Sequence, residues 1–116
     1  MESPDLQRIR HIARYCRRIS MERFGRDFDT FCRDYDYYDA VSMRLMQIGE
    51  LSAGLTETFW RETGNQVPWM IMKGMRNQFA HAYIAMDKEI IWKTALEDIP
   101  VLLRFCENAP EDASTI

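Results

Sequence analysis

The sequence contains few of the residues that mark metal-binding or disulfide-bonded proteins. It has only two histidines, His11 and His81, and three cysteines that lie far apart, with no CxxC pair. A structural zinc site needs a closer set of ligands, and an odd number of separated cysteines argues against a disulfide framework. We therefore expect no metal and no cofactor, and we expect Cys16, Cys32 and Cys106 to be reduced, mostly buried thiols.

Long apolar runs are also absent, although 47% of the residues are hydrophobic and 28% are charged, as in ordinary globular proteins. No run approaches the roughly 18 residues that span a bilayer. The first residues, MESPDLQRIR, lack the apolar segment of a secretory signal. A chain of 116 residues can form one core. These features predict a cytoplasmic protein without membrane contact, with a single domain over residues 1–108 and a frayed tail over 109–116.

Apolar residues recur at every third or fourth position over most of the chain, and this spacing predicts helices. Ser3, Pro4 and Asp5 have the sequence of a helix start, and Asp87 resembles the cap of a last helix. The patterns predict helices over about 4–24, 35–62 and 88–108, another that begins near residue 68, and a short helical turn around 28–32. No alternating pattern typical of strands is present. The expected fold is all-α, an up-and-down bundle of four to five helices.

Glycine and proline mark the points where these helices are expected to end or bend. Gly25 offers a left-handed stop after the first helix, and Pro68 comes where the third helix begins. Within the long second helix we expect a bend near Gly49 or Gly54. Pro100 lies inside the last helix, where a missing backbone N–H predicts a kink.

The stretch RNQFAHAY, residues 76–83, concentrates polar side chains in a short segment. On a regular helix a step of five residues turns about 140°, so Arg76 and His81 do not share a face. Asn77 and His81, four residues apart, do share one, as do Arg76 and Tyr83. Either the helix ends or unwinds near Ala80 and brings Arg76 towards His81, or a second copy of the chain supplies the missing group in a symmetric dimer.

These residue types are sufficient in outline to cleave RNA without a metal. A histidine with an ordinary pKa near 6.5 can accept a proton at neutral pH, and an arginine can hold a phosphate and stabilise negative charge on it. RNA carries its own nucleophile, the 2′-hydroxyl, so the expected products are a 2′,3′-cyclic phosphate and a 5′-hydroxyl. DNA should be inert. The same spacing also fits the surface of an ordinary helix without a catalytic role.

The motif and its surroundings resemble the HepT-like toxins, a branch of the HEPN (higher eukaryotes and prokaryotes nucleotide-binding) superfamily. RNQFAHAY fits the family pattern R-x4-H-x-Y. MQIGELS at 46–52 is similar to the IGE segment of the family, and VPW at 67–69 is similar to the PW that precedes its motif helix. MDKEIIWKTALEDIPVLL at 86–103 is similar to its Asp-initiated last helix. The resemblance covers roughly residues 5–107.

The resemblance implies a metal-independent ribonuclease toxin that acts as a homodimer, with the two motif helices facing each other across a cleft. Arg76 and His81 match the nuclease motif, and Asn77 matches its polar second position. Tyr83 matches the tyrosine to which a cognate MNT-type nucleotidyltransferase antitoxin adds AMP, which would silence the toxin by bulk and charge. The family usually has glycine two residues after this tyrosine, where this chain has Ala85, and the turn there is less permissive.

The first helix and the long second helix carry further candidate residues. Residues 8–26 hold seven arginines against one acid, Glu22, and seven minus one gives a local charge of +6 in a chain whose total is −3. One face of the first helix has Arg10, Arg14, Arg17 and Arg18, which could follow an RNA backbone or recruit an acidic antitoxin. A solvated helix face explains the same pattern. Glu50 could pair with Arg76 or Arg44 and so orient the arginine.

Two other functions remain open at this stage. A catalytically silent helical module that binds a nucleotidyltransferase or a nucleotide would keep Arg76 and His81 as well. A structural dimerisation domain would lose nothing but stability when His81 is replaced.

Overall fold

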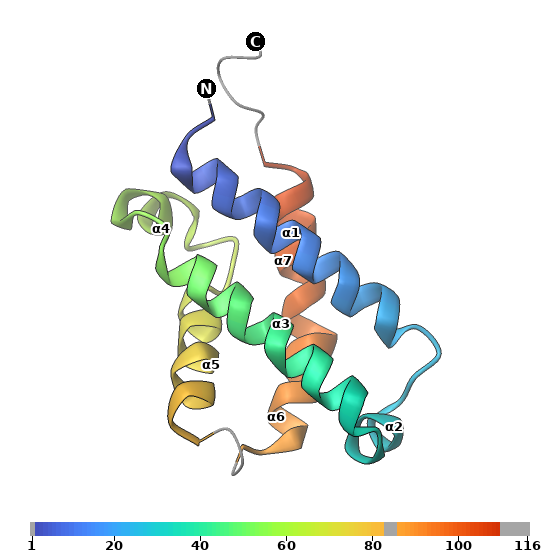
Figure 1. Cartoon of the computed structure of the whole chain (residues 1–116). Coiled ribbons are helices and arrows are strands. Elements are labelled where there is room, and N and C mark those ends of the chain that lie inside the picture. Colours follow the sequence, from blue (N-terminus) through green and yellow to red (C-terminus); the bar gives the residue numbers. More distant parts are fainter. Residues whose placement is uncertain (1, 83–85, 110–116) are drawn as a thin grey trace.

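The computed structural model describes residues 2–82 and 86–109 of the chain, and these residues form an all-α bundle (Figure 1). No strand occurs among them, so the predicted fold class is confirmed. The elements are α1 (Pro4–Arg23), α2 (Phe28–Arg33), α3 (Tyr35–Ala53), α4 (Glu57–Thr63), α5 (Trp69–Ala82), α6 (Lys88–Lys93), the π-helical segment η1 (Thr94–Asp98) and α7 (Ile99–Glu107). The first helix, the short helix around 28–32 and the helix that carries the motif agree with the sequence pattern.

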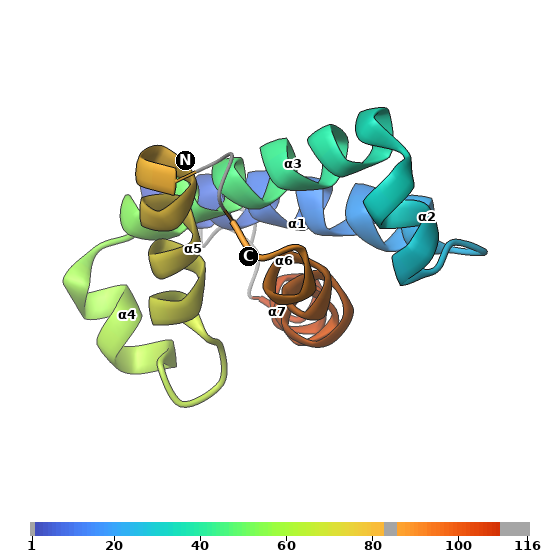
Figure 2. The ribbon, with the colours of Figure 1, turned by 90° about the horizontal axis from the view of Figure 1, so that it is seen from below.

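The helices form two layers, as the view from below shows (Figure 2). α1 and α3 lie side by side in one layer, α7 packs against α1 from the other layer, and α5 packs along α3. α2 closes the end of the bundle against α3 and α6. Among the described residues, no helix combines the length and the apolar character that crossing a membrane requires.

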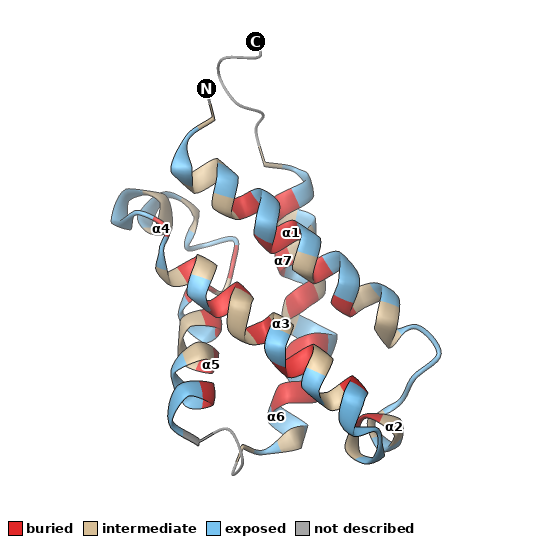
Figure 3. Cartoon of the chain, in the orientation of Figure 1, coloured by how far each residue is buried: buried red, intermediate tan, exposed pale blue. Residues whose placement is uncertain are grey.

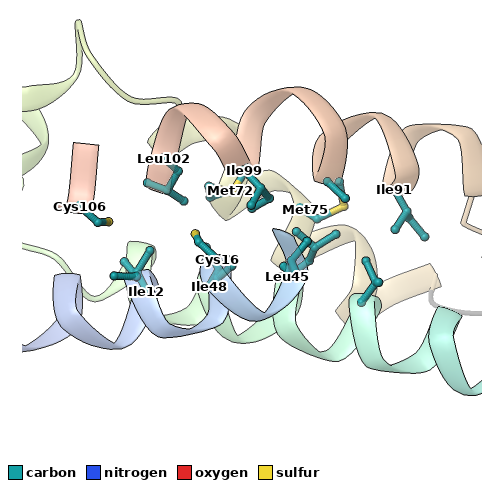
Figure 4. Close-up of a cluster of buried hydrophobic side chains, with 14 of the residues drawn as sticks. Ile12, Cys16, Leu45, Ile48, Met72, Met75, Ile91, Ile99, Leu102 and Cys106 are labelled. Atoms are coloured by element: carbon teal, nitrogen blue, oxygen red, sulfur yellow. The ribbon is translucent and has the colours of Figure 1, made fainter. Parts of the chain in front are cut away.

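The core lies between the two layers, where the apolar stripes of the helices face one another (Figure 3). Ile12 of α1, Ile48 of α3 and Leu102 of α7 are completely buried and point towards each other (Figure 4). Burial of a large aliphatic side chain contributes about 1.5–3 kcal/mol to folding. The stripes that the sequence pattern indicated therefore hold the bundle together.

All three cysteines are free thiols, as predicted from their spacing. Cys16 and Cys106 are buried between α1 and α7, and Cys32 is half-buried. Burial raises the pKa of Cys16 strongly, and it raises the pKa of Cys106 to about 12. A thiol reacts as its thiolate, so Cys16 and Cys106 are structural residues.

The helix predicted over 35–62 is wrong as a single helix, because the chain breaks between α3 and α4. α3 ends at Ala53, and Thr56 caps α4 by accepting a hydrogen bond from the backbone N–H of Phe59. The carboxylate of Asp5 fixes this corner from α1, since it accepts hydrogen bonds from the backbone N–H of Thr56 at 2.9 Å and from its hydroxyl at 2.7 Å. Apolar periodicity continues across the break, and for that reason the spacing of apolar residues did not reveal it.

Replacing Asp5 with alanine is expected to lower the free energy of unfolding by about 1–2 kcal/mol, because hydrogen bonds to a charged acceptor are lost. Urea denaturation of the purified protein measures this change. Asp36→Ala is the matched control, since Asp36 also lies in the first turn of a helix but forms no hydrogen bond or ion pair among the described residues. Equal losses in both variants would show that only helix-terminal charge matters.

The helix predicted over 88–108 is present as one continuous helical run from Lys88 to Glu107, and a π-helical segment lies within it just before Pro100. The backbone N–H of Ile99 bonds to the carbonyl of Thr94, five residues back, so η1 is wider than an α-helix. Pro100 then falls in the first turn of α7. Backbone N–H groups in a first turn have no acceptor within the helix, so proline loses no hydrogen bond there. The kink expected at Pro100 is thus a π-helical segment that precedes the proline.

Candidate functional site

Arg76 lies on the side of α5 that faces α3, and its side chain is half-buried there. Its Nη1 donates a hydrogen bond to Oε1 of Glu50 at 3.2 Å. Of the two pairings considered for Glu50, the structure shows the one with Arg76, because Arg44 pairs with Glu22 instead. The Glu50 side chain is 56% exposed, so the pair contributes little to stability and mainly orients the guanidinium.

Gly49 is the point of closest approach between α3 and α5. A Cβ atom at Gly49 would lie 2.5 Å from the Cβ of Arg76 and 2.7 Å from the carbonyl oxygen of Met72. Real Cβ atoms do not come so close to backbone, so only glycine fits here. Gly49 sets the depth of Arg76 against α3 while Glu50 sets its direction. Sequence reasoning treated Gly49 only as a possible bend, although a glycine inside a strongly periodic helix also signals close packing.

The guanidinium of Arg76 keeps unused hydrogen-bonding capacity. Its Nε is buried and has no acceptor among the described residues. An arginine carries five N–H donors, and only Nη1 makes a hydrogen bond to another described residue. A buried donor without an acceptor is unfavourable by about 1–3 kcal/mol, so Arg76 can gain from an added anion.

His81 lies inside the last turn of α5 and is exposed. The helix continues to Ala82, so the alternative in which it ends or unwinds near Ala80 is wrong. A regular helix keeps Arg76 and His81 about 140° apart, and in the described chain they do not share a face. Asn77 is exposed one turn before His81, and no hydrogen bond joins the two side chains in the part of the chain that the structure describes.

Tyr83 is outside the described residues. The α1 arginines, defined as Arg10, Arg14, Arg17 and Arg18, are all exposed on a helix that packs mainly on α3 and α7. The structure therefore does not place them beside Arg76. Among the described residues, no group of three or more histidine, cysteine, aspartate or glutamate side chains is arranged to hold a metal ion.

Comparison with known proteins agrees with the motif and its frame. The family model described as Ribonuclease HepT-like matches residues 6–109. The chain belongs to the HepT-like ribonuclease family. "Putative RNase TTE0752" of Caldanaerobacter subterraneus subsp. tengcongensis is 34% identical over 94 residues, which are 81% of this chain and 83% of that protein. "Probable ribonuclease HepT" of Thermococcus cleftensis is 38% identical over 84 residues, 71% of this chain and 76% of that protein.

A third HepT-like relative is more distant in sequence. "Putative RNase MJ1380" of Methanocaldococcus jannaschii is 31% identical over 90 residues, 70% of this chain and 82% of that protein. No solved structure gives a significant match to the chain. The resemblance drawn from RNQFAHAY and its flanking segments is thus confirmed at the level of the family.

Proposed function

We propose that this chain is a metal-independent endoribonuclease, the toxin of a toxin–antitoxin pair. The observation that carries the proposal is the position of Arg76, which Gly49 and Glu50 hold half-buried against α3 with donors left for an anion. Membership of the HepT-like family and the names of the relatives support RNA as the substrate.

In the proposed reaction, the imidazole of His81 removes the proton from a 2′-hydroxyl of RNA. The 2′-oxygen attacks the adjacent phosphorus, and the bond to the 5′-oxygen of the next nucleotide breaks. The leaving 5′-oxygen takes up a proton, so the products are a 2′,3′-cyclic phosphate and a 5′-hydroxyl. Arg76 binds the non-bridging oxygens and stabilises the charge that develops on them. Asn77 stands one turn from His81 and helps to orient it.

The working unit in this proposal is a homodimer. Because Arg76 and His81 lie on different faces of one regular helix, a second copy in a symmetric dimer would supply the missing group, so that the Arg76 of one copy and the His81 of the other form one site. Two neighbouring apolar side chains at the start of α5 suit such an interface, since Met70 is 70% exposed and Ile71 is 48% exposed.

Control by an antitoxin completes the proposal. Tyr83 follows His81 by two residues in the sequence. Addition of AMP to its hydroxyl by a cognate MNT-type nucleotidyltransferase would place a negative charge and a bulky group beside the proposed site, and both oppose RNA binding.

The test is cleavage of single-stranded RNA by the purified chain in EDTA, beside His81→Ala purified in the same way and DNA of the same sequence. The wild type alone is expected to leave 2′,3′-cyclic phosphate ends on RNA, with DNA intact. If both proteins cut equally, the nuclease is a contaminant. If neither cuts, the catalytically silent module that binds a nucleotidyltransferase or nucleotide becomes the better account.

Replacing Glu50 with glutamine is expected to slow cleavage about 3- to 10-fold, because the amide holds the Arg76 guanidinium less firmly than a carboxylate does. Unfolding free energy should change by less than about 1 kcal/mol, since the Glu50 side chain is 56% exposed. Glu22→Gln is the matched control, because it weakens the Glu22–Arg44 ion pair and leaves Arg76 untouched. Equal effects of both variants on the rate would remove Glu50 from the site.

A further inference from the structure

A groove with a volume of about 430 Å³ runs between α1 and the end of α7. Arg10, Arg14 and Arg17 line it along α1, and Glu107 of α7 lies across from them. Leu6 and Cys106 are among its apolar lining residues. Successive arginines are three or four residues apart, so their Cα atoms advance by about 4.5–6 Å along the helix axis.

The positive charge of this α1–α7 groove is only weakly neutralised within the chain. Arg14 forms no ion pair or hydrogen bond with any described residue, and Arg10 pairs with Glu2 near the N-terminus. Arg17 pairs with Glu107 at 3.5 Å, with both side chains about half exposed. The exposed Arg17–Glu107 pair contributes about 0–1 kcal/mol, so a polyanion can replace Glu107.

We propose that the α1–α7 groove binds the phosphate backbone of single-stranded RNA, as a second contact apart from the cleavage site. The inference rests on the proposed function, because it takes RNA as the polyanion. Arginine forks match phosphate oxygens in pairs, and a row of them at regular spacing suits a repeating backbone.

The regular spacing of the arginines favours a strand over an acidic protein. A nucleic-acid backbone presents one phosphate at each repeat, whereas a folded acidic partner presents carboxylates without a fixed period.

The test measures binding rather than cleavage, by fluorescence anisotropy of a labelled single-stranded RNA over a range of salt concentrations. All proteins carry His81→Ala so that the RNA stays intact. The groove variant is Arg10→Gln, Arg14→Gln and Arg17→Gln together. A matched control removes three exposed cations elsewhere, with Arg33→Gln, Arg61→Gln and Lys93→Gln, and has the same net charge. Circular dichroism checks that each variant is folded.

The groove variant is expected to bind RNA at least about tenfold more weakly. The slope of its log affinity against log salt concentration should be smaller in magnitude by about 2, because each of the three lost phosphate contacts contributes roughly 0.7 to that slope. The control should keep the slope. Equal losses in both variants, or no RNA binding by the parent protein, would overturn the proposal. So would unchanged RNA binding with lost binding of polyglutamate, which would indicate an acidic protein partner. If wild type fails to cut RNA but the groove variant still loses binding, the proposed function fails and the groove stands.

Discussion

Replacing Arg76 or His81 with alanine is expected to slow RNA cleavage by about two to four orders of magnitude, while the fold stays intact. Loss of a positioned general base removes about 10²–10⁴ in rate, and loss of a donor to the developing charge removes about 10²–10³. His81 is exposed, so its removal leaves no cavity. The cleavage rate of Arg76→Lys should lie between those of the wild type and Arg76→Ala, because lysine keeps the positive charge but cannot make two parallel hydrogen bonds to a phosphate.

A mixed dimer tests whether each site takes its groups from two chains. In a dimer of one Arg76→Ala chain and one His81→Ala chain, a shared arrangement pairs the intact Arg76 of one with the intact His81 of the other. One site is then complete, and about half of the wild-type rate should return. Differently tagged chains allow this heterodimer to be purified. If it is as inactive as either parent homodimer, the site lies within one chain.

Replacing Gly49 with alanine is expected to lower the free energy of unfolding by about 2–4 kcal/mol and to reduce cleavage further than the folded fraction explains. The added methyl group meets backbone and Cβ atoms of α5 at 2.5–2.7 Å, so α5 must move away and carry Arg76 with it. Overpacking of this kind typically outweighs the gain of about 1 kcal/mol that alanine brings to a helix interior.

Gly74→Ala is the matched control for this substitution. Gly74 also lies inside a helix, but no atom lies within 4 Å of a Cβ added there, so the change should stabilise the chain by about 0.5–1 kcal/mol. Urea denaturation at one fixed protein concentration measures both variants. If Gly49→Ala stabilises the protein as Gly74→Ala does, then α3 and α5 are not in contact at Gly49.

Those parts of the fold that depend on local chemistry could be predicted from the sequence. Ser3 caps α1 as expected, by accepting a hydrogen bond from the backbone N–H of Leu6. Gly25 follows α1 with a φ of 75°, the left-handed conformation that its position indicated. In both cases a residue and its immediate neighbours decide the structure.

Where a boundary left the apolar period unbroken, prediction failed. Leu51 and Leu55 stay in helical register across the gap between α3 and α4, so the break depends on the cap at Thr56 and its bonds to Asp5, which is distant in sequence. The π-helical segment before Pro100 has no residue signature except the proline itself. Periodicity reports which residues face the core, and it does not report backbone hydrogen bonds.

In the candidate site, too, residue types could be predicted from the sequence and helix packing could not. The pairing of Arg76 with Glu50 was one of two options that residue type allowed, and packing of α5 on α3 decided between them. The role of Gly49 could not be derived beforehand, because it depends on the distance between two helices. The places of Arg76 and His81 in catalysis remain predictions that the variants above test.

The contact at Gly49 also bears on how heat should inactivate the protein. Because Arg76 rests on the backbone of α3 without an intervening side chain, any loosening of α5 separates Arg76 from Glu50 at once. A partly loosened bundle would therefore not cleave RNA, and the temperature at which activity disappears should coincide with the melting temperature of the helices.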